Sequence, residues 1–97
     1  MSATVYVVGR FLAKAGKEEQ LKGVLNGLIA PTRREIGCYQ FDLLESSAEP
    51  REFSIVERWD GNKGLDQHLA SDYVQGALAK LEPLVEEPPD IRRYALV

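Results

Sequence analysis

Four stretches of the chain are rich in β-branched and aromatic residues, and most of them alternate apolar with polar positions. These stretches cover 4–14, 38–45, 52–59 and 91–97, and their pattern predicts β-strands. The first, TVYVVGRFLAK, is apolar on both faces, which predicts a strand covered on both sides. The second and third flank the turn-forming segment SSAEPR, so we expect them to pair as an antiparallel hairpin.

Between the strands, the apolar spacing changes to the period of amphipathic helices. The first helix is predicted to begin at Lys17, with Glu18, Glu19 and Lys22 on the face opposite its apolar stripe. Its apolar stripe consists of Leu21, Val24, Leu25, Leu28 and Ile29. Pro31 predicts a kink, and the capping-box spacing of Thr32 and Glu35 predicts that a helix restarts there before Gly37 stops it.

The element order defines the expected fold. A short helix opens at Asp60 or Gly61, and Ser71 with Asp72 offers the N-cap of a third helix. The resulting order β-α-β-β-α-α-β is that of a ferredoxin-like α+β sandwich with an antiparallel four-stranded sheet. We expect one domain over 1–97, and a homodimer, because the helices cover only one sheet face and a second copy would cover the other.

Composition excludes several classes of function. The net charge is −3 and the basic residues are scattered, so we expect no nucleic-acid partner. No apolar run is long enough to span a bilayer and the N-terminus lacks a signal-peptide layout, which predicts a cytoplasmic protein without membrane attachment. One cysteine and one histidine cannot form a Cys/His zinc cage, and no glycine-rich phosphate loop follows a strand. We therefore expect chemistry without a metal or other cofactor.

The segment FSIVERWDGNKGLDQHLASDY holds the candidate catalytic residues. Period two places Phe53, Glu57 and Trp59 on one face of a strand, so the carboxylate lies between large apolar side chains. Such a group forms an ion pair, faces water in a cleft, or has a raised pKa. A structural explanation for Glu57 is a buried salt bridge to Arg33 or Arg34, and it is as plausible as a catalytic role.

Other residues of interest also have structural explanations. His68 lies at the edge of a helical apolar stripe, so we expect a partly exposed imidazole, and Tyr73 follows closely enough to share its cavity. Trp59 is either a core anchor or a pocket wall, and Asn62 either orients a substrate oxygen or caps a helix. Cys38 is expected to be a small structural residue, on the strand face opposite the one shared by Tyr39, Phe41 and Leu43.

The order of these residues resembles the antibiotic biosynthesis monooxygenase domain across essentially the whole chain. The resemblance rests on PTRREIGC at the end of the first helical region, then on P-x-x-F-x-x-x-E-x-W and on HLAS. It implies a dimeric α/β barrel and, as in the best-studied members, oxygenation of phenols or quinols without metal or flavin. The positions that match are Phe53, Glu57, Trp59, His68, Ser71 and Tyr73. The haem-degrading branch is poorly matched, because Leu78 stands where its axial histidine is expected.

The favoured hypothesis is a cofactor-independent monooxygenase that oxidises a small phenolic or quinol-type substrate with O₂. His68 would be the base, and Glu57 would orient it or replace it. The walls and hydrogen-bonding groups of the substrate site would be Phe53, Trp59, Tyr73, Tyr39, Phe41 and Asn62. The alternatives are a small-metabolite isomerase that uses the same His/Glu pair, and a non-catalytic dimeric binding module. The last would show a fully packed His68 with no cavity beside it.

Overall fold

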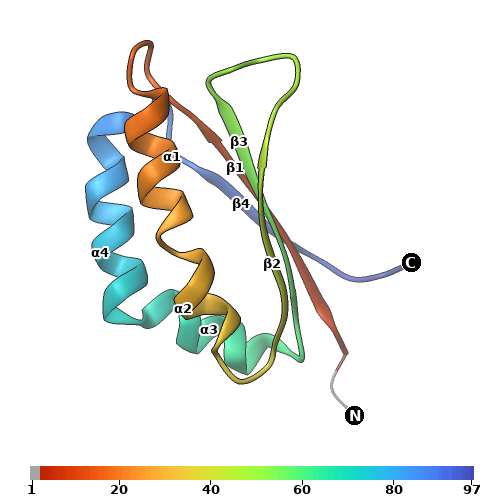
Figure 1. Ribbon diagram of the computed structural model, residues 1–97. Helices are drawn as coiled ribbons and strands as arrows, with labels where there is room; N and C mark the ends of the chain where they lie inside the picture. The colour runs from red at the N-terminus through yellow and green to blue at the C-terminus, as the bar shows by residue number, and fades with distance from the viewer. Residues whose placement is uncertain (1–2) are drawn as a thin grey trace.

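The computed structural model describes residues 3–97 and has the predicted element order, with the helical layer on one side of a sheet (Figure 1). The sheet contains β1 (Val5–Leu12), β2 (Cys38–Glu45), β3 (Glu52–Trp59) and β4 (Asp90–Tyr94). All its pairings are antiparallel, in the order β2-β3-β1-β4. This confirms the ferredoxin-like α+β sandwich.

The helices form a single layer against one sheet face, as Figure 1 shows. They are α1 (Glu18–Asn26), α2 (Ile29–Arg33), α3 (Asn62–Ala70), α4 (Asp72–Leu81) and the short 3₁₀ helix η1 (Glu82–Leu84). None of the helices in residues 3–97 has the length and apolar character needed to cross a membrane. Within the same residues, the other sheet face carries no helix.

The first helical region breaks before its proline and not at it. Pro31 has no N–H to donate to the carbonyl of Gly27, so the break comes one turn earlier, between α1 and α2. There the Leu28 N–H donates to the Leu25 carbonyl at 3.1 Å, in a tighter turn. The predicted helix start at Thr32 is wrong, because Thr32 lies inside α2 and is fully buried.

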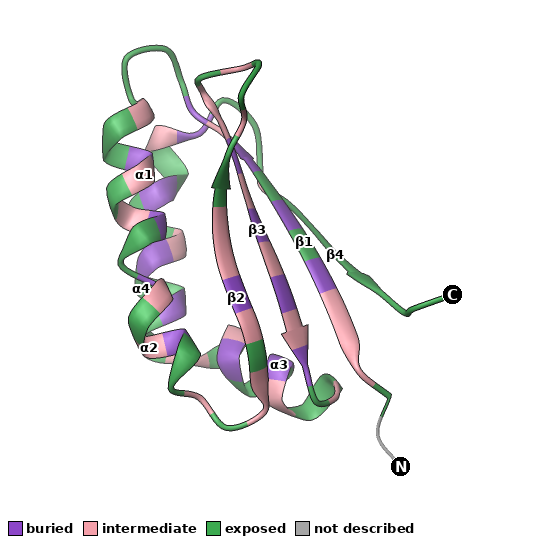
Figure 2. Ribbon diagram, turned by 45° about the vertical axis from the view of Figure 1, so that its right-hand side comes forward, coloured by how far each residue is buried: buried purple, intermediate pink, exposed green. Residues whose placement is uncertain are grey.

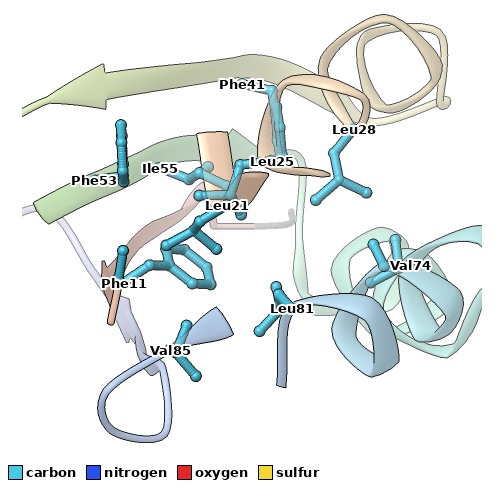
Figure 3. Packing of buried hydrophobic residues seen from close by; sticks show 12 residues of the cluster. Phe11, Leu21, Leu25, Leu28, Phe41, Phe53, Ile55, Val74, Leu81 and Val85 are labelled. Atoms are coloured by element: carbon cyan, nitrogen blue, oxygen red, sulfur yellow. The ribbon is translucent and has the colours of Figure 1, made fainter. Parts of the chain in front are cut away.

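The core lies between the helices and the inward face of the sheet. Buried and less buried positions alternate along β1 and β3 (Figure 2). In the main cluster, Phe11 and Phe53 from the sheet face Leu21, Leu25 and Leu81 from the helices (Figure 3). This position makes Phe53 a core residue. A smaller cluster under α3 contains Val7, Trp59 and Leu65.

The start of β2 contains an irregularity that the alternating pattern did not predict. Its pairing with β3 shifts between Cys38 and Gln40, which leaves Tyr39 as the extra residue of a bulge. Tyr39 is 56% exposed, whereas Phe41 is buried and Cys38 packs against both core clusters. The expectation that Tyr39 shares the face of Phe41, with Cys38 on the opposite face, is therefore wrong.

Candidate active site

His68 is buried near the C-terminal end of α3. Only 3% of its surface is exposed, so the expectation of a partly exposed residue is wrong. Its ring lies 5.0 Å from the Trp59 ring and 5.9 Å from the Phe41 ring, measured between centroids. Ser71 is at the predicted helix junction, and its hydroxyl donates to the His68 carbonyl at 2.6 Å. The imidazole is therefore held from the β2–β3 side of the sheet and from the helix end.

Glu35, which was not predicted as a site residue, is the direct partner of His68. Its Oε2 lies 2.5 Å from the His68 Nδ1, across 33 residues of sequence. Glu35 follows α2, and the next turn requires Gly37, whose φ of 91° is in the left-handed region that favours glycine. The Asp60 N–H donates to the Gly37 carbonyl at 2.8 Å, which ties this loop to the start of α3. Local turn chemistry thus brings the carboxylate to the imidazole.

Tyr73 and Thr32 complete a hydrogen-bonded group around Glu35. The Tyr73 hydroxyl donates to Glu35 Oε2 and lies 3.3 Å from the His68 Nδ1. Thr32 Oγ1 lies 3.1 Å from the same hydroxyl. Burial, followed by the bond to Glu35, raises the pKa of Tyr73 to about 12. Tyr73 therefore stays protonated and remains a donor to the carboxylate at neutral pH.

This network determines which nitrogen of His68 is available to a ligand. An ionised carboxylate accepts hydrogen bonds and cannot donate them, so Glu35 favours a proton on Nδ1 of the neutral imidazole. Nε2 is then the unprotonated nitrogen of a side chain that lines a cavity. A histidine oriented by a carboxylate in this way is suited to act as a general base.

Glu57 is the second titratable group beside the cavity. It is 8% exposed, and the Trp59 indole Nε1–H donates to its Oε1 at 2.8 Å. Burial raises the pKa of Glu57, and the bond from Trp59 partly offsets that effect. The alternative explanation, an ion pair with Arg33 or Arg34, does not hold, because Arg33 pairs with Asp42 at 2.9 Å and the Trp59 indole is the hydrogen-bond donor to Glu57.

The cavity has a volume of about 290 Å³ and lies between the sheet and the helices α3 and α4. Six of the sheet residues that line it form two rows across three strands. Ile55, Gly9 and Ile91 are neighbours in one row, and Glu57, Val7 and Arg93 are neighbours in the other. Gly9 has no side chain, and a Cβ there would lie 3.3 Å from the Phe11 ring. The glycine therefore keeps the centre of the floor open.

A larger hollow of about 940 Å³ lies on the outer side of α1 and α4. Tyr73 reaches it, but its lining includes neither His68 nor Glu57 and is largely small or apolar, including Gly23, Gly27 and Gly76. Its ionisable side chains are Tyr73 and Lys80, so its lining contains no histidine or carboxylate that could act as a general base near neutral pH. The smaller cavity is thus the candidate active site.

The predicted site residues separate into those at the cavity and those elsewhere. Phe41, Glu57 and His68 line it, Trp59 supports both titratable groups, and Tyr73 meets the imidazole from the opposite side. Phe53 and Tyr39 lie outside it. Asn62 does not line it either, because its Oδ1 accepts from Arg93 Nη1 at 2.8 Å. Glu35 and Arg93 are the two residues that sequence reasoning missed.

Glu57→Gln should make stability less dependent on pH. The raised pKa means that folded Glu57 binds its proton more tightly than the unfolded chain does. Its contribution to the free energy of unfolding is therefore largest at acid pH and falls as pH rises from the unfolded-state pKa through the folded one. An amide cannot ionise and still accepts from the Trp59 indole. Urea unfolding measured between acid and neutral pH should show that the free energy of unfolding varies less with pH in the variant. Relative to the wild type, the stability of the variant should increase toward neutral pH.

Glu19→Gln on the exposed face of α1 is the matched control, and it should keep the wild-type pH profile. A Glu57→Gln variant that loses stability progressively, relative to the wild type, as pH rises would show that the buried carboxylate is favoured as the anion.

The chain is similar in sequence to a described family and to named proteins. Residues 4–80 match the family model described as antibiotic biosynthesis monooxygenase. A Mycobacterium tuberculosis protein named "Putative monooxygenase Rv0793" is 33% identical over 88 residues, covering 91% of this chain and 86% of that protein. "Putative monooxygenase YcnE" of Bacillus subtilis is 30% identical over 83 residues, covering 86% of this chain and 87% of that protein.

A solved structure shares the fold of this chain. The crystal structure of protein SO0527 from Shewanella oneidensis is 35% identical with a TM-score of 0.93, and the match covers 99% of this chain and 93% of that one. With a family model that covers most of the chain and relatives at this level of identity, the chain belongs to the antibiotic biosynthesis monooxygenase family.

Proposed function

We propose that this protein is a monooxygenase that oxidises a small phenolic or quinol-type substrate with O₂, using neither metal nor flavin. The observation that supports it most is the Glu35–His68 pair beside a largely apolar cavity. A cavity of roughly 150 Å³ holds one benzene ring. At about 290 Å³, this cavity has room for one substituted ring or two fused rings.

The reaction begins with removal of a proton from the aromatic hydroxyl. His68 Nε2 accepts it, and the Glu35 carboxylate stabilises the imidazolium that forms. The phenolate that results is electron-rich and passes an electron to O₂ directly. One oxygen atom then enters the product and the other leaves as water, whose two hydrogens and two electrons come from the substrate. The apolar walls exclude bulk water from this sequence.

Glu57 is suited to a complementary role as proton donor. Its raised pKa favours the neutral carboxyl group, which can donate a hydrogen bond into the cavity that it lines. Proton removal by His68 and proton return by Glu57 then occur in one compartment. His68 and Glu57 also support an isomerase as the second candidate, because two proton-transfer groups line one cavity. Consumption of O₂ distinguishes the monooxygenase from the isomerase.

We also propose that two copies pair through the open face of the sheet. Val8 with Val56, and Tyr6 with Tyr94, are cross-strand neighbours on the face away from the helices. Val8 and Tyr94 are 40% and 47% exposed, and Leu44 on β2 is 49% exposed. Apolar side chains therefore lie on all four strands of a face without a helix, and exposed apolar patches commonly mark interaction surfaces. A second sheet of the same kind would cover it.

His68→Ala should lower turnover by about 10²–10⁴-fold if His68 is the base. Oxygen-electrode measurements against a panel of quinols and anthrones provide the assay. The buried ring and its lost bond to Glu35 should also reduce the free energy of unfolding by about 1–3 kcal/mol, so circular dichroism must show that the variant is folded.

Cys38→Ser is the control for this assay. Burial raises the pKa of the Cys38 thiol, which makes a thiolate nucleophile unfavourable, so the serine variant should stay within a few-fold of wild-type turnover. A folded His68→Ala variant with most of its activity would transfer the role of base to Glu57. Failure of the whole panel to consume O₂ would contradict the monooxygenase proposal.

Val8→Glu should weaken the dimer, because it places a charge at the centre of the open face. Sedimentation at micromolar concentration should give the mass of two chains for the wild type and a shift toward one for the variant. Ala79→Glu, on the exposed side of α4, introduces the same charge and should leave the dimer intact. A compact wild-type monomer would overturn the pairing proposal.

A further inference from the structure

We infer that Arg93 on β4 binds an anionic oxygen of the substrate, across the cavity from His68. The inference rests on the proposed function, and it restricts the proposed phenolic or quinol-type substrates to those that carry an anionic group. The expected substrate is an aromatic ring with an ionisable hydroxyl on the side of His68. On the side of β4 it carries a negatively charged oxygen, such as that of a carboxylate. Arg93 thereby becomes a determinant of substrate specificity.

The sheet order places Arg93 and His68 on opposite sides of the cavity. His68 is held by Trp59 of β3, by Phe41 of β2 and by Glu35, all on the β2–β3 side. Arg93 belongs to β4, the strand at the opposite edge of the sheet. Both residues line the same cavity, so a ligand between them has His68 on one side and Arg93 on the other.

The spacing between the two sides suits a flat ring. Glu57, Val7 and Arg93 are neighbours in one row of the sheet, with Glu57 and Arg93 two strand spacings apart. Two spacings correspond to roughly 10 Å between backbones, which leaves room for a substituted aromatic ring between side chains. The adjoining row has Gly9 at its centre, so the floor is open where the ring would lie.

The guanidinium of Arg93 is held in place by α3. Its Nη1 donates to Asn62 Oδ1 at 2.8 Å, and its Nη2 donates to Asp66 Oδ1 at 2.6 Å. Asn62 and Asp66 are one helical turn apart, so they fix the group from one side. A guanidinium has five N–H donors, and these two bonds leave three. Asn62 thus contributes to the site by positioning Arg93.

A structural explanation for Arg93 is that it only fastens α3 to β4. The Asp66 side chain is 63% exposed and that of Arg93 is 40% exposed, and exposed ion pairs of this kind contribute little to stability. That explanation does not account for the presence of an arginine in the lining of an otherwise largely apolar cavity. A guanidinium there strengthens any hydrogen bond to an anionic oxygen of the ligand.

The test compares two probes that differ at one end of the ring. The p-hydroxybenzoate ion carries a carboxylate opposite its hydroxyl, and p-cresol carries a methyl group there. Trp59 is the only tryptophan of the chain and its indole N–H is bonded to Glu57, so its single indole NMR resonance reports binding without any need for turnover. The wild type should bind p-hydroxybenzoate at least about tenfold more tightly than p-cresol.

Arg93→Gln should remove this preference. Affinity for p-hydroxybenzoate should fall by about tenfold or more, whereas affinity for p-cresol should change by less than about twofold. Lys63→Gln removes the same charge from an exposed position on α3 and should preserve the wild-type preference. In a second variant, Asp66→Asn, the carboxylate that competes for Arg93 is removed, so binding of p-hydroxybenzoate should become severalfold tighter.

Each other outcome overturns the inference. Equal wild-type affinity for the two probes, or equal losses for both in Arg93→Gln, would leave Arg93 a structural role only, without affecting the proposed oxidation chemistry. Weaker or unchanged p-hydroxybenzoate binding in Asp66→Asn would contradict it as well. Absence of binding by either probe would exclude small hydroxyaromatic ligands, and the proposed function with them if the quinol panel also fails to consume O₂.

Discussion

The hydrogen bond between the Glu35 carboxylate and the His68 imidazole is the contact on which the site depends. It joins the loop after α2 to the last turn of α3, and the hydroxyl of Tyr73 from α4 donates to the same carboxylate. The loop after α2 and the two consecutive helices α3 and α4 therefore meet at one oxygen. The same bond sets the tautomer of the only histidine, and it leaves Nε2 as the nitrogen that can act in the cavity.

The sheet supplies the other half of the site through its register. Alternation along β3 brings Glu57 and Trp59 to the helical side, and the antiparallel pairings extend that row through Val7 to Arg93. A one-residue shift in register would move each of these side chains to the opposite face. The alternation of side chains along the strands thus determines two things. It gives the apolar face that packs against the helices, and it places the titratable groups on that same face.

Periodicity was sufficient to predict the strands, the helices and their order, because burial of one face imposes a period of two or 3.6 residues. Periodicity failed for residues whose side chains bond to partners that are distant in the sequence. The capping-box spacing of Thr32 and Glu35 predicted a helix start, yet Thr32 bonds Tyr73 and Glu35 bonds His68. A bulge at Tyr39 likewise changed which side chains of β2 face the core. The local pattern pointed to Glu57 and His68 as candidates, whereas Glu35 becomes a candidate only through its contact with His68, 33 residues away in sequence.

The tautomer of His68 is the most direct test of this account. Because the chain has one histidine, ¹⁵N NMR of its neutral imidazole gives one pair of ring-nitrogen signals that needs no assignment by mutation. The account predicts a protonated Nδ1 in the wild type, and a shift of population toward protonated Nε2 in Glu35→Ala. A wild-type imidazole protonated on Nε2, or a tautomer that does not respond to loss of the Glu35 carboxylate, would contradict it.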